Sequence, residues 1–400
     1  MKKIIYVHYQ KNLSEGSAVH VSRFSQSFSA LCLDRKITFD IWAPRKEFSM
    51  PGEALGKRAG GLRSFLGKYY LREFKVLLQQ IFRSVQEFFL LRKVRPDVVI
   101  TRYDAETLSI HWACSALKIP VVTEFNGKDR GELAGTYSDH KQLPLVNRLF
   151  SNCTAMSYSV AGMAVSDEIA ADLRYCNSSG KPIIVNHNGV DLAEFNPQKD
   201  TAELFQRLGI ATDSVVIGYI GSFIVWHAPQ RLFNAFQELI NTGRNVSLLL
   251  VGRRLPEIDR MIQSMTLEAQ ARVHYTGFVT HEEIPAYLGV MDITVLPNTQ
   301  PYCSPLKIFE YMAMAKACLV PATPTIRSII KDRSEGWLFD PDSDEDFYQG
   351  LVLLAQDAQL RRRLGELARQ RVEAEFTWDH NAERVMQLIQ DGLAWKNNKY

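Results

Sequence analysis

Four residues in the segment 304–320 are spaced so that they could bind a phosphorylated ligand. Ser304 suits a helix N-cap and Pro305 the first helical position, which predicts a helix whose free N–H groups and positive dipole end face outward. Such an end can hold an anion. Lys307 and Glu310 follow at i+3 spacing, which suits a nucleotide diphosphate with its phosphates at the helix end and its ribose at Glu310. An ordinary capped amphipathic helix with a surface lysine and glutamate fits the same residues.

Two strand-like segments that end in glycine precede this helix. Residues 215–222 and 246–252 are apolar runs that reach Gly221 and Gly252. The carboxyl ends of parallel strands meet at one edge of a sheet, where doubly wound folds bind ligands. We therefore expect these turns to lie near the helix at 304–320, although glycines at strand ends also mark ordinary turns.

The first half of the chain shows the same alternation of strands and helices. Apolar segments at 4–7 and 38–42 flank a helical pattern, and Gly16 lies in the loop after the first strand, where a glycine lets the backbone approach a phosphate or a sugar. A chain of 400 residues exceeds what one hydrophobic core usually serves. We therefore expect an α/β protein of two domains, residues 1–200 and 201–400.

Charge and cysteine usage exclude several classes of function. A formal net charge of +3 is too small to indicate nucleic-acid binding in general. The six cysteines are scattered without metal-ligand spacing, so we expect reduced thiols in the cytosol and no metal site. The short apolar run after the first residues is too short for a signal sequence, and no window approaches the length of a membrane span.

The stretch from residue 56 to 95 differs in composition from the rest. Its lysines and arginines greatly outnumber its glutamates and alternate with leucines, phenylalanines and tyrosines. This pattern is typical of a basic amphipathic helix that lies on an anionic membrane surface. A pair of helices packed on the sheet with a solvated basic face fits it as well. No nucleic-acid-binding motif accompanies the charge, so nucleic acid is not expected as a partner.

A carboxylate stands at the end of a predicted strand in the first half. The segment 120–124 predicts this strand, and Glu124 is followed by Phe125, Asn126 and Gly127 at its ligand edge. There Glu124 could act as an acid or base, or bind an acceptor hydroxyl. An exposed turn residue fits the same position.

Motifs in the second half form a set that resembles a known family. They are Asn188-Gly189-Val190-Asp191 with Phe195 and Pro197, Gly218-Tyr219-Ile220-Gly221-Ser222-Phe223 with Trp226-His227, Leu249-Leu250-Val251-Gly252, His274-Tyr275-Thr276-Gly277-Phe278-Val279 and Phe376-Thr377-Trp378. Together with the segment 304–320, this set resembles glycosyltransferases of the GT-B type, and more narrowly the retaining family 4. The resemblance extends over about residues 185–390, and a weaker likeness lies at Glu15-Gly16-Ser17-Ala18-Val19-His20.

The resemblance implies a GT-B fold, two Rossmann-like domains facing across a cleft. The first domain would bind an acceptor and the second a nucleotide-sugar, without any metal or other cofactor, and the last helix, about 378–393, is a candidate to pack back on the first domain. Lys307 and Glu310 are the implied catalytic residues, and Glu124 is a further candidate. His20, Asp104 and Asn126 are candidates for binding the acceptor. The implied donor-binding residues are Gly16, Gly221, Ser222, His227, Arg253, Phe278, Val279, Ser304, Pro305, Leu306, Lys307 and Glu310.

The chain departs from the family pattern at the donor site. Tyr302 stands where the family usually has the first of two glutamates, which contacts the donor sugar. The family's phosphate-binding arginine and lysine would fall at Ser222 and His227, so Lys307 and Arg253 must supply more of the positive charge. Alanines at 315 and 317 replace the usual glycine and proline after the helix, which concerns its C-terminal turn.

The resulting expectation is a cytoplasmic hexosyltransferase, peripheral to the inner face of the membrane. It would transfer a sugar from a UDP-sugar or a GDP-sugar to an acceptor hydroxyl with retention of anomeric configuration, in the synthesis of a lipid-linked or cell-envelope polysaccharide. The basic stretch 56–95 favours that acceptor. Two alternatives stay open: a nucleotide-sugar epimerase or hydrolase, and a non-catalytic nucleotide-sugar-binding partner in a polysaccharide assembly complex.

Overall fold

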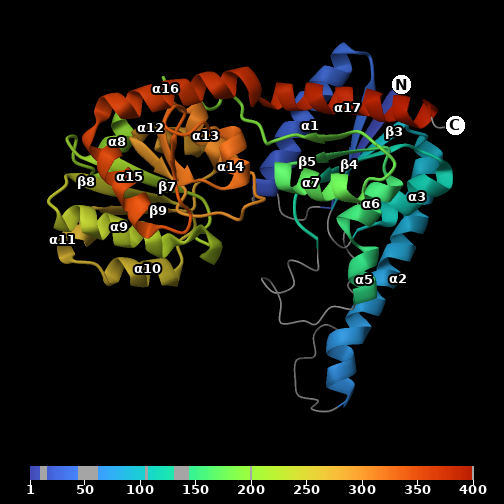
Figure 1. Ribbon diagram of the computed structural model, residues 1–400, viewed down its shortest axis with the longest axis horizontal. Helices are drawn as coiled ribbons and strands as arrows, with labels where there is room; N and C mark the ends of the chain where they lie inside the picture. Colours follow the sequence, from blue (N-terminus) through green and yellow to red (C-terminus); the bar gives the residue numbers. More distant parts are fainter. Residues whose placement is uncertain (10–15, 44–61, 104–106, 130–143, 199–200, 399–400) are drawn as a thin grey trace. The chain divides into compact units, whose positions relative to one another are not determined.

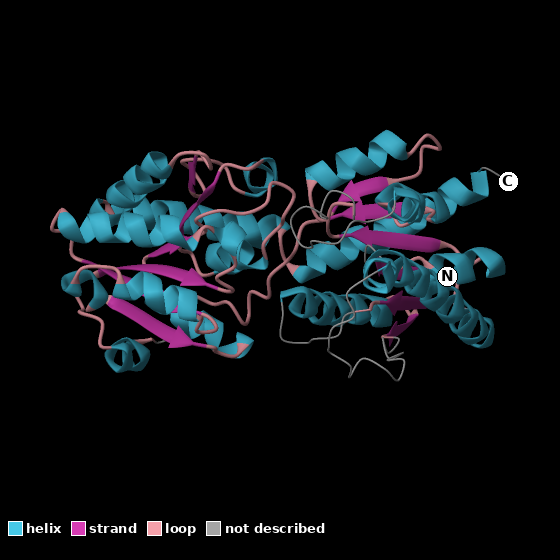
Figure 2. Ribbon diagram, turned by 90° about the horizontal axis from the view of Figure 1, so that it is seen from below, coloured by secondary structure: helices cyan, strands magenta, loops and turns pink. Residues whose placement is uncertain are grey.

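The computed structural model describes residues 1–9, 16–43, 62–103, 107–129, 144–198 and 201–398 (Figure 1). The chain divides into two compact units, Met1–His187 with Asn381–Tyr400, and Asn188–His380. Each unit has a parallel sheet with helices on both faces (Figure 2), so the predicted α/β class is confirmed. The second unit begins at Asn188, whereas the sequence suggested a boundary at about residue 200.

The sheet of the first unit has six parallel strands in the order β2-β1-β3-β4-β5-β6. Strands β1, β3, β4 and β5 are almost wholly buried, as expected where helices cover both faces of a sheet. In register, Ile5 pairs with Asp40 on one side and with Val99 on the other. The strands are β1 (Lys3–Val7), β2 (Thr38–Trp42), β3 (Val98–Tyr103), β4 (Val121–Phe125), β5 (Ala161–Ala164) and β6 (Ile183–Val185).

Helices connect these strands as crossovers. Helix α7 illustrates the local rules, because Ser166 caps it by accepting from the backbone N–H of Ile169, and Asp167 and Glu168 occupy its first turn. Among the described residues, the helices of the first unit are α1 (Gly16–Asp34), α2 (Leu62–Val94), α3 (Ser109–Leu117), α5 (Pro144–Leu149), α6 (Asn152–Tyr158), α7 (Asp167–Cys176) and most of α17 (Trp378–Asn398).

The sheet of the second unit has the order β12-β11-β10-β7-β8-β9, with all neighbours parallel. Strand order reverses beside β7 and β10, where doubly wound sheets place their ligand crevice. The predicted strands at 215–222 and 246–252 are the neighbours β7 and β8. The strands are β7 (Val215–Ile220), β8 (Val246–Val251), β9 (Val273–Gly277), β10 (Ile293–Val295), β11 (Ala317–Pro321) and β12 (Trp337–Phe339).

Helix α9 shows how a helix of the second unit packs on its sheet. In α9, Leu232, Phe236 and Leu239 recur at helical spacing and are buried, so the helix packs on the sheet. The helices are α8 (Ala202–Leu208), η1 (Val225–His227), α9 (Pro229–Asn241), α10 (Pro256–Gln263), α11 (Leu267–Gln270), η2 (His281–Glu283), α12 (Ile284–Val290), α13 (Leu306–Ala313), α14 (Pro324–Ile329), α15 (Asp344–Gln356) and α16 (Ala358–Glu375).

Most of the last helix, α17, contacts the first unit. Asn381 Nδ2 donates to the carbonyl of His187 at 2.8 Å, and Arg384 Nε donates to Asn186 Oδ1 at 2.9 Å. Both pairs join residues that lie almost 200 positions apart in sequence, 194 and 198. The chain therefore returns to its first unit after completing the second.

Helix α2 contains most of the basic stretch, while residues 56–61 lie outside the described part of the chain. It packs against α3, and its first turns continue past the sheet (Figure 1). Apolar side chains at helical spacing on α2 remain 51–62% exposed: Phe74, Leu78, Ile81, Val85 and Phe89. In the described residues, no helix is both long enough and apolar enough to span a membrane.

The expectation of six reduced cysteines is wrong for one pair. Cys153 of α6 and Cys176 of α7 form a disulfide with their Cα atoms 5.7 Å apart. The reason is spatial, because α6 and α7 are neighbours in the fold although the two cysteines are 23 positions apart in sequence. The free cysteines are Cys32, Cys114, Cys303 and Cys318.

Candidate functional site

The N-terminal end of helix α13 lies at the centre of the candidate site. Pro305 is its N-cap, with φ −71° and ψ 127°, and no side chain caps the helix. The expectation that Ser304 is the N-cap is therefore wrong, because the extended conformation of Pro305 delays the helix by one residue. The carbonyl of Ser304 accepts from Asn188 Nδ2 at 2.5 Å, which fixes the chain where it enters the helix.

The hydroxyl of Ser304 is left without a role in the protein's own hydrogen bonding. Ser304 is 8% exposed, and within the described chain its Oγ has no hydrogen-bond partner. A buried hydroxyl without a partner is costly, and an uncapped helix end carries free N–H groups and a positive dipole. A bound anion would satisfy both features, as the sequence predicts for this segment.

Lys307 brings a cation to the same place. Its Nζ donates to Tyr219 Oη at 3.0 Å and lies 4.4 Å from the centroid of the Tyr219 ring. A side chain at Gly221 would come within 2.7 Å of this nitrogen, so the glycine makes room for the ammonium group. Burial lowers the pKa of Lys307 to about 7, although the nearby Glu310 opposes the shift. A phosphate beside it would restore the charged form.

The ends of β7 and β8 meet beside this lysine. Tyr219 Oη donates to the carbonyl of Ser222 at 2.6 Å, and His227 Nδ1 lies 2.8 Å from that hydroxyl. Burial and the neighbouring lysine lower the pKa of His227 to about 3. A side chain at Gly252 would lie 2.2 Å from the carbonyl oxygen of Gly221, so the two glycine turns touch. The structure thus brings the predicted Gly221, Ser222 and His227 together with Lys307.

Glu310 is held by a histidine from another element. His281 Nε2 lies 2.9 Å from Glu310 Oε1, and His281 Nδ1 lies 3.4 Å from Glu194 Oε1. Burial would lower the pKa of His281, but the two carboxylates and their hydrogen bonds raise it to about 9. The predicted ribose ligand is therefore one end of a three-residue chain, Glu194–His281–Glu310.

The other predicted donor residues lie at the ends of β8 and β9. Arg253 follows Gly252 and is exposed, and its carbonyl accepts from Tyr275 Oη at 2.8 Å. Phe278 and Val279 follow β9 directly, and Phe278 is 64% exposed. An exposed aromatic ring at a strand end is suited to stacking on a planar ligand.

In the first unit, Glu124 is buried in a dense polar cluster. Its Oε1 accepts from Arg102 Nη1 at 3.0 Å and from Asn126 Nδ2 at 2.7 Å, and Oε2 accepts from Tyr6 Oη at 3.1 Å. His20 Nε2 lies 2.8 Å from Oε1. Burial alone would raise the pKa of Glu124, but His20, Arg102 and the hydrogen bonds hold it well below its ordinary value. Such a carboxylate is a weak base.

The candidates for the acceptor side are only partly brought together. His20 and Asn126 both contact Glu124, so these three lie in one cluster. Asp104, the third acceptor candidate, lies outside the described residues. Gly16, which was predicted to bind the donor, is the exposed first residue of α1.

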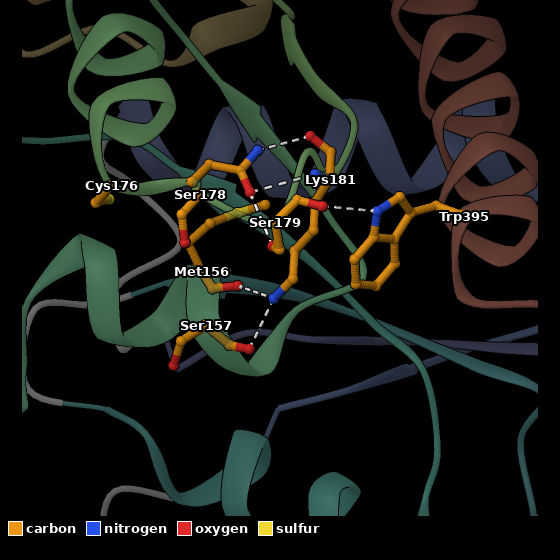
Figure 3. Close-up of a pocket in the computed structure, with 8 residues that line it drawn as sticks. Met156, Ser157, Cys176, Ser178, Ser179, Lys181 and Trp395 are labelled. Carbon is orange, nitrogen blue, oxygen red and sulfur yellow. Dashed lines mark hydrogen bonds between the residues drawn. The ribbon is translucent and has the colours of Figure 1, made fainter. Parts of the chain in front are cut away.

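The first unit also has a cavity of about 430 Å³, which is not lined by Glu124, His20 or Asn126 (Figure 3). Lys181 Nζ donates to the carbonyls of Met156 and Ser157, at 2.9 Å and 2.7 Å, and lies 5.5 Å from the centroid of the Trp395 ring. Lys181 precedes β6, so the cavity is at the edge where strands begin, opposite the edge that binds ligands in such sheets. We interpret it as the place where α17 docks.

Sequence reasoning missed three residues that support the site. Tyr219 accepts a hydrogen bond from the Lys307 ammonium group. His281 contacts Glu310, and Glu194 contacts His281 in turn. Tyr219 and His281 both stand in or beside glycine-ended strands that the sequence singled out. No spacing rule connects them to the helix at 304–320, because each contact bridges separate elements.

Two family models match the chain. Glycosyltransferase Family 4 matches residues 15–194, and Glycosyl transferases group 1 matches residues 200–371. Among curated proteins, the chain is similar to the alpha-D-kanosaminyltransferase of Streptomyces kanamyceticus, with 26% identity over 169 residues, which are 42% of this chain and 43% of that protein. Other curated relatives at similar identity are matched over 48% to 64% of their length.

Solved structures share the fold. Sucrose-phosphate synthase from Thermosynechococcus elongatus has a TM-score of 0.70 at 18% identity, with 98% of this chain and 100% of that chain covered. Anabaena HepE in complex with UDP has a TM-score of 0.70 at 15% identity and the same coverage. At these identities the likeness concerns the fold alone.

Proposed function

Because this chain belongs to the GT-B glycosyltransferases of the family 4 type, we propose that it transfers the sugar of a nucleotide-diphosphate sugar to an acceptor hydroxyl with retention of configuration. The observation that carries the proposal is the end of α13. There the uncapped helix, the Ser304 hydroxyl, which has no partner among the described residues, and the partly buried ammonium group of Lys307 converge. These groups suit a diphosphate, and Glu310 lies one turn further along for a ribose. UDP and GDP are the proposed nucleotides, and the complex of Anabaena HepE with UDP supports testing UDP first.

The proposed mechanism is mainly electrostatic. The bond between the sugar carbon and the diphosphate oxygen breaks, the acceptor oxygen bonds to that carbon, and the acceptor proton passes to the leaving phosphate. Charge therefore grows on the diphosphate, where the dipole of α13 and Lys307 stabilise it. No protein base is required by this scheme, which agrees with the saturated hydrogen bonding of Glu124. Because the dipole of α13 and Lys307 supply positive charge at the diphosphate, we propose that turnover needs no metal ion and survives a chelator.

We propose a lipid-linked or cell-envelope polysaccharide as the acceptor, reached at a membrane surface. The support is α2, whose exposed apolar face carries Phe74, Ile81 and Phe89, with Arg92 and Lys93 exposed in its last turn. Apolar and basic groups on one helix suit an anionic lipid surface. Binding to vesicles of anionic lipid, compared with neutral vesicles, tests this part separately from donor binding.

Localisation at the cytoplasmic face is the remaining part of the proposal. The disulfide between Cys153 and Cys176 bears on it, because disulfides persist mainly in oxidising compartments. Thiol labelling of protein taken directly from cells tests the point. If Cys153 and Cys176 are labelled, their thiols are free, which agrees with a reducing compartment. If the label does not react with them, they are joined in the disulfide, which argues against such a compartment.

A panel of nucleotide-sugars tests the donor assignment. A ligand that binds the folded state raises the melting temperature by mass action, so the matching donor should stand out in a thermal-shift screen. Glu310→Ala should lose this shift, whereas Glu268→Ala, which removes a 65%-exposed partner of Arg272 in the same unit, should keep it. Wild-type affinity and turnover in Glu310→Ala would refute the assignment. Release of free sugar or of an epimer without acceptor would point to hydrolase or epimerase chemistry.

A further inference from the structure

We propose that His281 is a positioning residue that fixes Glu310 for recognition of the donor ribose, and that Glu194 holds His281 in turn. This inference rests on the proposed function, because it gives Glu310 the ribose as its ligand. It adds two residues that do not touch the nucleotide themselves. It also gives the nucleotide site a dependence on pH that Glu310 alone would not have.

The geometry of the chain Glu194–His281–Glu310 supports the proposal. Each ring nitrogen of His281 faces one carboxylate, at 2.9 Å for Glu310 and 3.4 Å for Glu194. The side chains of Glu310, Glu194 and His281 are 9%, 13% and 24% exposed, so little water competes for these contacts. Three elements that are separate in sequence thus meet at one imidazole.

The supports of His281 are themselves fixed. Phe195 packs against the imidazole with ring centroids 5.6 Å apart, and its carbonyl accepts from Arg369 Nη1 at 2.7 Å. On the other side, Thr280 and Glu283 form a capping box, in which the Thr280 N–H donates to Glu283 Oε2 at 2.8 Å. The imidazole is therefore held from both the turn before α8 and the start of η2.

The charge of the imidazole follows from its surroundings. A neutral imidazole has one N–H and can donate to one carboxylate only, whereas the protonated ring donates to both. The acidic groups that face it are Glu194 and Glu310, with Glu282 and Glu283 in its own element, and the nearest cation on α13 is Lys307. The pKa of His281 is accordingly raised to about 9, so the ring is a cation at neutral pH.

A carboxylate held at one oxygen can serve a ligand with the other. Among the described residues, His281 is the one donor that contacts the Glu310 carboxylate, and it contacts Oε1. Glu310 is thereby fixed before the nucleotide arrives, and Oε2 is left to accept from a ribose hydroxyl. A site built to bond a hydroxyl discriminates strongly against an analogue that lacks it. The expected signature is preference for UDP or GDP over the 2′-deoxy and 3′-deoxy forms.

The first experiment is made on the protein without nucleotide. Imidazole resonances of histidine-labelled protein are followed with pH, and His281 is identified from its absence in His281→Gln. We expect its pKa near 9 in the wild type and clearly lower in Glu194→Gln, which keeps the acceptor but removes one charge. An ordinary pKa for His281 in the wild type would overturn the proposal while leaving the proposed function intact.

The second experiment measures the affinity for UDP, GDP and their deoxy forms by calorimetry. His281→Ala should weaken binding of the preferred ribonucleotide about tenfold and reduce its advantage over the deoxy form by a similar factor. His281→Gln, which can still donate to Glu310, should recover part of both. His380→Gln removes another imidazole from the same unit, bound to Thr377 Oγ1 at 3.0 Å, and should change neither.

The pH profile separates this role from a merely structural one. Wild-type affinity should fall as the pH rises through about 9, and Glu194→Gln should move this fall to lower pH, although Glu194 touches no ligand. His281→Gln should lack that fall and keep only the contribution of Lys307. Unchanged affinity and discrimination in His281→Ala overturn the proposal, with the donor assignment intact. If the wild type binds no nucleotide, the proposed function fails and this role fails with it.

Discussion

The two units each bury a carboxylate beside a histidine, and they differ in how much of that carboxylate the protein uses. Glu124 contacts His20 and three further donors, which engage both of its oxygens. Among the described residues, the carboxylate of Glu310 hydrogen-bonds to His281 alone, through one oxygen. A carboxylate whose acceptor sites are filled acts as a fixed charge within the fold. One that keeps an oxygen unfilled can still bind a ligand.

The difference assigns separate tasks to the two units. Removing Glu124 would leave Arg102 without its counter-charge and the buried His20 without its carboxylate partner, which is expensive. Removing Glu310 would release a single imidazole that Glu194 still contacts. We therefore expect the first change to act on folding and the second on nucleotide binding.

The largest expected effect is on stability, from Glu124→Gln. The amide has nearly the same shape but no charge, so the cluster loses the anion that offsets Arg102 and His20. We expect a loss of about 3–5 kcal/mol in the free energy of unfolding of the first unit. Urea denaturation followed by circular dichroism measures it. Asp172→Asn, which removes a 47%-exposed partner of Lys128, should cost less than about 1 kcal/mol. A stable Glu124→Gln protein that has lost turnover would break the comparison, because Glu124 would then act on the substrate.

The next prediction is that pH separates the two clusters. The pKa of Glu124 is lowered in the folded state, so its contribution is present above the ordinary pKa of glutamate and is lost as the pH falls. The pKa of His281 is raised from 6.5 to about 9, so its contribution is complete below 6.5 and is lost as the pH rises through about 9. This shift in pKa corresponds to at most about 3–4 kcal/mol of stability.

Variants of each unit isolate these contributions. In Glu124→Gln, stability should depend less on pH than in the wild type at the acid end of the range. In His281→Gln, stability should depend less on pH than in the wild type at the alkaline end. The difference from wild type is the quantity to compare, because buried histidines such as His111, whose pKa is near 3, add an acid loss of their own. Stability curves from pH 3 to 10 measure it. If the two variants follow one profile, the two clusters do not differ as we infer.

Lys307→Met should act on binding and leave stability nearly unchanged or improved. The ammonium group is buried at a cost that lowers its pKa to about 7, and methionine removes that cost along with the charge. We expect the affinity for UDP or GDP to fall about 10- to 100-fold, as measured by calorimetry. Lys316→Met is the matched control, since Lys316 is also a partly buried lysine of this unit, and its Nζ donates to the carbonyl of Gly289 at 2.9 Å. An equal loss of affinity in both variants would contradict a local role for Lys307.

The sequence predicted those parts of the fold and site that depend on local pattern. The α/β class and a helix carrying Lys307 and Glu310 on one face follow from apolar periodicity, glycine positions and i+3 spacing. The family was predicted from the resemblance of several motifs to known glycosyltransferases, and the family matches confirm it. The contact of His281 with Glu310 joins residues 29 positions apart, and that of Lys307 with Tyr219 joins residues 88 apart. Packing, which no local pattern encodes, decides such contacts. The disulfide between α6 and α7 was missed for the same reason.

The smallest expected effect concerns the turn that ends α13, where the sequence has Ala315 in place of the family's glycine. Ala315 has φ 52°, in the left-handed region that costs a residue with a side chain about 1 kcal/mol or more. Ala315→Gly should therefore stabilise the second unit by roughly 0.5–1 kcal/mol, less the entropy that glycine adds to the unfolded chain. Ala355→Gly, within helix α15, should do the opposite by a similar amount. If Ala315→Gly also changes nucleotide affinity, the turn affects Glu310, and the donor site of this unit extends to the far end of its helix.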